Sequence, residues 1–241
     1  MRRFYAPPGQ FHDRTVKLNI EETRHLRDVL RMSTGERAQI FDGEGQEFLA
    51  EITIIGKRET TLQIVETIEP PAPESDLDLM LVASVYKNDK LDLVVQKAVE
   101  LGVARFMPIV TNRSESKLEA AMKRTERWRK IALEATKQCE RAKIMTVDEP
   151  IQFDEFVADA NANERLLLMF SEKDGNGLPD DSPAKKITAL VGPKGGWEDS
   201  EIQLAAERGF IPLKLGRRIM RAETAAITFT ALLQNRFGDL N

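Results

Sequence analysis

Two glycine-containing segments near the end of the chain carry the residues best suited to binding chemistry. One reads Val-Gly-Pro-Lys-Gly-Gly-Trp at residues 191–197, and the other reads Leu-Gly-Arg-Arg-Ile-Met-Arg-Ala-Glu-Thr-Ala at residues 215–225. Each follows an apolar run and precedes a helical pattern, so both are predicted to be loops at the carboxyl ends of parallel strands, where open α/β sheets bind ligands. Glycines leave peptide N–H and C=O groups uncovered by a Cβ. The pattern indicates a site for a nucleotide-like cofactor.

The spacing within these loops does not match the common phosphate-binding and hydrolytic motifs. Residues 192–196 fit neither a Walker A loop nor the Gly-x-Gly-x-x-Gly pattern of dinucleotide folds. His12 and His25 both lie in the β-rich first part of the chain, and no paired carboxylates occupy the loops, so a Ser/His/Asp arrangement has no support. No cysteine or histidine has a partner at metal-ligand spacing, and no metal is expected. An apolar pocket bordered by arginines favours transfer to RNA over hydrolysis.

Charge is segregated along the chain, although the net charge of the 241 residues is only -4. Residues 105–143 contain 11 Lys and Arg against 5 Asp and Glu, and residues 214–221 contain four bases and no acid. Residues 148–181 reverse this balance, with 10 acids and 2 bases. Local patches, rather than the total charge, attract a polyanion such as RNA.

Two readings of these basic patches are open. For the helix around residues 123–130, a solvated charged face explains the sequence as well as RNA contact does. For Arg217, Arg218 and Arg221, a functional role is favoured, because they lie inside the second glycine loop with no acid beside them until Glu223.

The composition is typical of a globular protein from a reducing compartment. With 41% hydrophobic and 31% charged residues, a chain of this length is expected to form two domains. The single cysteine, Cys139, permits no internal disulfide. The first residues lack the apolar core of a signal peptide, and no run approaches membrane-spanning length. We therefore expect a soluble, cytoplasmic protein.

The first seventy residues are typical of a small β-barrel or half-barrel. Alternating or apolar runs bounded by turn residues predict strands at 38–41, 47–55 and 60–68. One helix interrupts them: Asn19 is its expected N-cap, Glu22 is placed to close a capping box, and Gly35 is expected to end it. His25, on this helix, is interpreted as a structural residue.

The proline-rich residues 69–75 cannot continue a sheet or enter a helix, and they mark a domain boundary. Beyond them, strands are expected at 77–85, 104–110, 144–147, 166–170, 187–191 and 211–215. Helices are expected at about 89–101, 118–139, 200–208 and 222–237. This alternation predicts an α/β domain with a mainly parallel sheet covered on both faces. The chain is thus divided into a β-rich domain at 1–70, a linker at 71–76 and an α/β domain at 77–241.

Six blocks of sequence, in order along nearly the whole chain, form a specific combination: residues 2–5, 25–31, 41–45, 96–103, 192–196 and 215–225. Together they resemble the RsmE family of 16S rRNA uridine-N3 methyltransferases. The resemblance implies a SPOUT methyltransferase domain with a deep trefoil knot, joined to an N-terminal PUA-like RNA-binding β-barrel. It also implies a homodimer that uses S-adenosylmethionine and acts on 16S rRNA in the small ribosomal subunit, at the decoding-region helix. Periodicity alone could not indicate a knot, because threaded chains are rare.

The resemblance also implies roles for individual residues. The adenosine of the cofactor would be held by apolar and glycine residues: Met169, Gly192, Pro193, Gly195, Gly196, Leu215, Gly216, Ile219, Met220, Thr224 and Ala225. Some of these, Met169, Leu215 and Met220, are equally well explained as core residues. The phosphates of the RNA would be bound by Arg2, Arg3, Arg24, Arg31 and Arg217.

Arg221 is the predicted catalytic residue, because a fixed cation can stabilise the negative charge that develops on the uracil oxygens as N3 loses its proton. The general base is left open between solvent and Glu223, and Glu223 is also explained as a capping group in the first turn of the last helix.

The chain departs from the family pattern at three positions. Lys194 stands where the family usually has glutamate, Glu198 stands where a serine usually caps the next helix, and Cys139 stands where serine is common. Cofactor binding through backbone groups is expected to survive all three changes. Two other classes of function are open: a SPOUT enzyme that methylates ribose 2′-oxygens, and a non-catalytic RNA-binding or ribosome-assembly protein.

Overall fold

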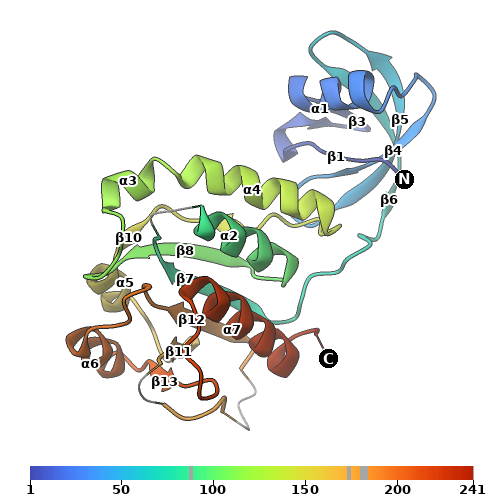
Figure 1. Ribbon diagram of the computed structural model, residues 1–241. Coiled ribbons are helices and arrows are strands. Elements are labelled where there is room, and N and C mark those ends of the chain that lie inside the picture. The colour runs from blue at the N-terminus through green and yellow to red at the C-terminus, as the bar shows by residue number, and fades with distance from the viewer. Residues whose placement is uncertain (87–88, 173–174, 180–183, 241) are drawn as a thin grey trace. The chain divides into compact units, whose positions relative to one another are not determined.

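The computed structural model describes residues 1–86, 89–172, 175–179 and 184–240 (Figure 1). The chain forms two compact units. The first contains Met1–Glu74 and Thr136–Ile144, and the second contains Ser75–Ala135 and Met145–Asn241. The sequence places residues 136–144 in the second domain, whereas in the structure they pack with the first unit.

The first unit, all of whose residues are described, is built on a six-stranded sheet in the order β1-β4-β5-β6-β3-β2. Strand β1 pairs parallel with β4, and the other neighbours are antiparallel. The strands are β1 (Arg3–Tyr5), β2 (Phe11–His12), β3 (Thr15–Leu18), β4 (Arg37–Phe41), β5 (Glu47–Ile55) and β6 (Thr60–Ile68). The predicted strands β4, β5 and β6 are confirmed, because alternate residues such as Ile40, Ile52 and Leu62 form the buried core.

One helix, α1 (Ile20–Arg24), continues as a π-helical turn over His25–Val29. Asn19 caps it as predicted, because its side-chain oxygen accepts a hydrogen bond from the Glu22 amide at 2.9 Å. The expected capping box is wrong, since the buried Glu22 carboxylate binds the Lys137 ammonium at 2.7 Å instead.

The end of this helix also differs from the predicted one. The helical conformation stops before Arg31, whose φ of 53° lies in the left-handed region. Gly35, the predicted end, lies in the turn that precedes β4. The structural interpretation of His25 fits its surroundings, because its ring packs edge-on against Phe4 at 5.9 Å.

A buried charge network holds residues 136–144 within the first unit. The Arg3 guanidinium forms two hydrogen bonds with the Glu47 carboxylate, at 2.8 and 3.0 Å. It also donates to the carbonyls of Thr136 and Arg141, the latter at 2.7 Å. Only 8% of the Arg3 side chain and 0% of the Glu47 side chain are exposed. The pair therefore joins the sheet to a segment that is distant in the sequence.

Within the described residues, the second unit contains a seven-stranded sheet whose neighbours are all parallel. Its order is β10-β8-β7-β12-β11-β13, with β9 beside β8. The strands are β7 (Asp78–Ser84), β8 (Arg105–Val110), β9 (Thr146–Val147), β10 (Ile151–Gln152), β11 (Leu166–Phe170), β12 (Lys186–Val191) and β13 (Ile211–Leu213). The predicted parallel α/β sheet is confirmed, and β10 is an additional strand that the sequence did not indicate.

Helices cover both faces of this sheet (Figure 1). On one face, α2 (Lys90–Glu100) packs against α7 (Ala222–Phe237), and α7 contacts β7 and β12. On the other face, α5 (Phe153–Ala158) packs against α6 (Asp199–Glu207), and their apolar residues form one core with β7, β8, β11 and β12. No helix in the described part of the chain is long and apolar enough to cross a membrane.

The predicted basic helix over residues 118–139 is two helices, α3 (Leu118–Met122) and α4 (Thr125–Gln138). Hydrogen bonds to residues that are distant in the sequence hold the chain at and just after the break between α3 and α4. Arg124, between the two helices, donates to the Tyr86 carbonyl at 2.8 Å, and the buried Trp128 donates from Nε1 to Asp92 at 3.0 Å. Because both partners lie more than 30 residues away in the chain, local periodicity did not reveal them.

Replacing Arg3 by methionine should lower the free energy of unfolding by about 3–5 kcal/mol, because the buried Glu47 carboxylate would lose its partner. Arg37→Met is a matched control, since Arg37 lies on β4 of the same sheet and its half-exposed pair with Glu51, at 3.8 Å, should contribute less than about 1 kcal/mol. Urea unfolding followed by circular dichroism measures both variants. Equal losses would contradict the structural role of Arg3.

Candidate functional site

Both glycine loops line one pocket at the carboxyl edge of the parallel sheet. Its lining comes from the end of β11, the loop after β12, the loop before α7 and the first turn of α7: Phe170, Glu172, Val191, Gly192, Pro193, Lys194, Gly196, Trp197, Ile219, Met220, Ala222 and Ala225. These segments meet because parallel strands end at the same edge of the sheet.

The predicted cofactor residues divide into two groups. Those on the pocket wall are Gly192, Pro193, Gly196, Ile219, Met220 and Ala225. Gly195, Leu215, Gly216 and Thr224 lie outside this lining. Gly216 has a φ of 71°, so its place in the second loop is a backbone requirement of the turn. Lys194, within the predicted loop, also lines the pocket, and five lining residues were not predicted from the sequence: Phe170, Glu172, Val191, Trp197 and Ala222.

Met169 lies in the core and not in the pocket. It is 1% exposed and packs in the cluster that contains Leu190 and Trp197. The next residue, Phe170, lines the pocket and lies 6.1 Å from the Phe229 ring of α7. Neighbouring side chains of a strand point to opposite faces of the sheet. The structure therefore assigns the apolar wall to Phe170 instead of Met169.

Trp197 fixes the first glycine loop against the sheet. Its indole Nε1 donates to the Phe170 carbonyl at 2.9 Å, and its ring lies 5.3 Å from the Phe153 ring. A Cβ on Gly192 would lie 2.5 Å from the indole, so only glycine allows this approach. The indole therefore packs directly against the backbone of the loop.

Arg113, in the loop after β8, holds the glycine loop from a second direction. Its Nη1 donates to the Gly195 carbonyl at 3.1 Å, and its Nε lies 3.5 Å from the Glu198 carboxylate. A Cβ on Gly195 would lie 3.4 Å from the Arg113 side chain. Gly195 thus contacts this arginine and lies outside the pocket lining.

Lys194 forms an ion pair with a carboxylate of the loop that follows β8. Its ammonium lies 3.5 Å from the Glu115 carboxylate, which follows Arg113 in the same loop. The reversed charge at this position therefore adds an ion pair between the two loops. About two thirds of the Lys194 side chain is exposed, so the pair is screened by solvent.

Glu198, the second departure from the family pattern, caps α6 better than expected. It forms a capping box with Glu201, whose carboxylate accepts a hydrogen bond from the Glu198 amide at 2.8 Å. Both carboxylates also accept hydrogen bonds from Asn112. Its side-chain Nδ2 donates to Glu198 at 2.9 Å, and its backbone N–H donates to Glu201 at 3.0 Å. The cap thereby also fixes the loop after β8.

Arg221 occupies the N-cap position of α7, between two pocket-lining residues, Met220 and Ala222. It is exposed at the rim of the pocket. Its position leaves the guanidinium accessible to a group that enters the pocket from solvent.

Glu223 forms an ion pair with Lys90 of α2, with 2.6 Å between the ammonium and the carboxylate. Burial raises the pKa of Glu223, but hydrogen bonds from Lys90 and from its own backbone, with the charges of Lys90 and Arg221, lower the pKa below its ordinary value of 4.5. A carboxylate with a lowered pKa is a weak base. This disfavours Glu223 as the group that removes a proton. Among the described residues, no group of three His, Cys, Asp or Glu side chains is placed to hold a metal ion.

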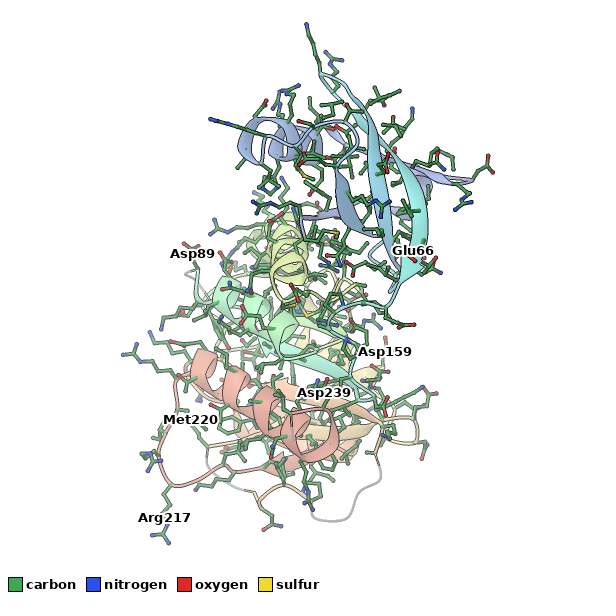
Figure 2. All side chains as sticks on the ribbon, turned by 90° about the vertical axis from the view of Figure 1, so that its right-hand side faces the viewer. Glu66, Asp89, Asp159, Arg217, Met220 and Asp239 are labelled. Atoms are coloured by element: carbon green, nitrogen blue, oxygen red, sulfur yellow. The ribbon has the colours of Figure 1, made fainter. Side chains whose placement is uncertain are left out.

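The predicted RNA-binding arginines have different surroundings. Arg2, Arg24 and Arg31 are exposed on the first unit. In the second unit, Arg217 is exposed and its side chain points away from the body of the protein (Figure 2). Arg3 is buried by its pair with Glu47, so the structure gives it a role in the fold and withdraws it from the RNA-binding set.

Replacing Glu223 by glutamine should destabilise the protein by up to about 1 kcal/mol near neutral pH, since the Lys90 side chain is 37% exposed and the ion pair is screened. Because the folded pKa lies below the ordinary 4.5, this contribution is present above that value and is lost as the pH falls through the folded pKa. Denaturant midpoints of the two proteins should differ at about pH 7 and converge as the pH is lowered until the Glu223 carboxylate is protonated in the folded protein. A difference that persists in acid would contradict the assignment.

The sequence matches two known domain families along most of its length. Residues 73–234, which include all the residues that line the pocket, match the RNA methyltransferase domain family. Residues 18–65 match the RNA methyltransferase PUA domain.

Comparisons with individual proteins also find RNA methyltransferases. The protein named ribosomal RNA small subunit methyltransferase E from Synechocystis is 32% identical, over 92% of this chain and 74% of the relative. The protein of the same name from Aquifex aeolicus is 33% identical, over 89% of this chain and 91% of the relative. The crystal structure of ribosomal RNA small subunit methyltransferase E from Neisseria gonorrhoeae bound to S-adenosyl methionine has 34% identity, a TM-score of 0.90 and 100% coverage of both chains. The chain belongs to the ribosomal RNA small subunit methyltransferase E family.

Proposed function

We propose that this protein transfers a methyl group from S-adenosylmethionine to N3 of an unpaired uridine in the decoding-region helix of 16S rRNA, with the small ribosomal subunit as substrate. Its family makes it an S-adenosylmethionine-dependent methyltransferase of small-subunit rRNA. The observation that carries the proposal is the pocket shared by both glycine loops, in a chain that aligns throughout with a cofactor-bound relative. The choice of uridine N3 is supported by the resemblance of the sequence blocks.

Three further properties belong to the same proposal. The protein acts as a homodimer, it works in the cytoplasm, and its second unit contains a trefoil knot. Each is supported by the sequence resemblance to the RsmE family.

The pocket residues fit an adenosine-containing cofactor. Adenine requires an apolar slot and a few fixed polar groups. Val191, Ile219 and Met220 supply apolar walls, and Gly192 and Gly196 supply peptide groups that no Cβ covers. When bound, S-adenosylmethionine supplies an electrophilic methyl group on a positively charged sulfur.

The acceptor nitrogen must lose its proton, because neutral uracil N3 is a poor nucleophile. As the proton leaves, negative charge spreads onto the uracil oxygens, and the Arg221 guanidinium at the pocket rim stabilises it. Glu223 is held by Lys90 and has a lowered pKa, so the proton passes to solvent. Since N3 takes part in base pairing, the uridine has to be unpaired or flipped out before it reacts.

The exposed arginines would bind the RNA backbone around this uridine. Arg2, Arg24 and Arg31 on the first unit and Arg217 on the second loop are accessible to phosphates. Contacts of this kind set the position of the RNA, while the pocket selects the base.

Replacing Arg221 by alanine should reduce the rate of methyl transfer by about 100-fold or more, because one donor to developing negative charge is lost. The dissociation constant for S-adenosylmethionine, measured by calorimetry, should change little, since Arg221 is not among the residues that line the pocket. Arg218→Ala, an exposed arginine of the same loop, is the matched control for general loss of positive charge. Unchanged transfer in Arg221→Ala would remove Arg221 from the mechanism.

The reaction itself is tested with labelled S-adenosylmethionine and small subunits from a strain that lacks the modification. Mass spectrometry of the digested RNA should identify 3-methyluridine. Label on a ribose would instead assign the protein to 2′-O-methylation. Cofactor binding without any transfer to small subunits would contradict the proposed substrate, and the absence of cofactor binding would favour a non-catalytic RNA-binding role.

A further inference from the structure

We propose that Glu172 is a cofactor-binding residue whose carboxylate compensates the positive charge of S-adenosylmethionine, and that it lets the protein distinguish this cofactor from its uncharged-sulfur product, S-adenosylhomocysteine. The inference rests on the proposed use of the pocket for S-adenosylmethionine. Glu172 lies outside the six sequence blocks that resemble the RsmE family, so the sequence did not indicate this role.

Glu172 reaches the pocket from the carboxyl end of β11. The residue before it, Ser171, is 1% exposed and donates its amide to the Leu213 carbonyl at 2.8 Å, which fixes the chain at this point. Glu172 lines the pocket together with the first glycine loop. A Cβ on Gly196 would lie 2.7 Å from Glu172 Oε1, so the carboxylate lies directly against the bare backbone of that loop. The φ of 71° at Gly196 also favours glycine there.

Positive charges surround the pocket. Lys194 lines it, and Arg221 adjoins it in the second loop, where Arg217 and Arg218 are also exposed. The sulfonium of a bound cofactor adds one more positive charge to this region, and a carboxylate in the pocket offsets that charge. Among the described residues that line the pocket, Glu172 is the one acid.

Two carboxylates beside the glycine loops and the last helix have cationic partners. Glu115 lies 3.5 Å from the Lys194 ammonium, and Glu223 lies 2.6 Å from that of Lys90. Both are outside the pocket lining. Because Lys194 replaces the glutamate that is usual in the family, this chain depends on Glu172 for negative charge inside the pocket.

The test compares the two ligands that differ in charge at sulfur. Calorimetry with Glu172→Gln should give an S-adenosylmethionine dissociation constant raised by roughly tenfold at low salt, because a charge pair near a protein surface is only partly screened. The dissociation constant for S-adenosylhomocysteine should stay within about twofold of the wild-type value, since the product sulfur is neutral. The loss for S-adenosylmethionine should shrink at about 0.5 M salt.

Two further variants complete the experiment. Glu164→Gln is the matched control, because Glu164 precedes the opposite end of the same strand, and it should affect neither ligand. Glu172→Asp keeps the charge and should restore part of the preference, even if the glutamine variant is less stable. Equal losses for both ligands, or no loss for either, would overturn the role of Glu172. Failure of the wild-type protein to bind S-adenosylmethionine would instead contradict the proposed function.

Discussion

The pocket depends on the contact between the Trp197 indole and the bare backbone of Gly192. The indole is 4% exposed and is hydrogen-bonded to the Phe170 carbonyl, so the loop that leaves β12 is fixed to the end of β11. No other residue type could occupy position 192 without displacing the indole. This contact and the indole hydrogen bond fix the first glycine loop to the sheet. A loop fixed in this way needs less ordering when a ligand binds.

Charge pairs outside the pocket show how this chain accommodates its unusual residues. Glu198 and Glu201 together hold Asn112, and Arg113 reaches back to the Gly195 carbonyl. Lys194 forms an ion pair with Glu115, which lies in the same loop as Asn112 and Arg113. Both substituted side chains thus contact the loop that follows β8.

Sequence patterns predicted the regular elements well where local periodicity decides them. The helix Ala222–Phe237 and the strands Glu47–Ile55 and Thr60–Ile68 have the predicted bounds. In the candidate site, β11 reads Leu-Leu-Leu-Met-Phe, which is apolar on both faces, so the sequence could not show that Phe170 and not Met169 faces the pocket. The family resemblance implies an RNA contact for Arg3, and the sequence does not reveal its buried partner because Glu47 lies 44 residues away. Contacts between residues so far apart in the sequence depend on the tertiary fold, and local sequence patterns do not reveal them.

The return of residues 136–144 to the first unit has a consequence for how the protein is made. Three pairs join that segment to the first 74 residues: Arg3 with the carbonyls of Thr136 and Arg141, Lys137 with Glu22, and Arg141 with Glu74. On a ribosome, the sheet of the first unit emerges long before these partners do. Domains usually fold as units during synthesis, N-terminal first. Here the contacts of Arg3, Glu22 and Glu74 with residues 136–141 can form only after more than half of the chain has been translated.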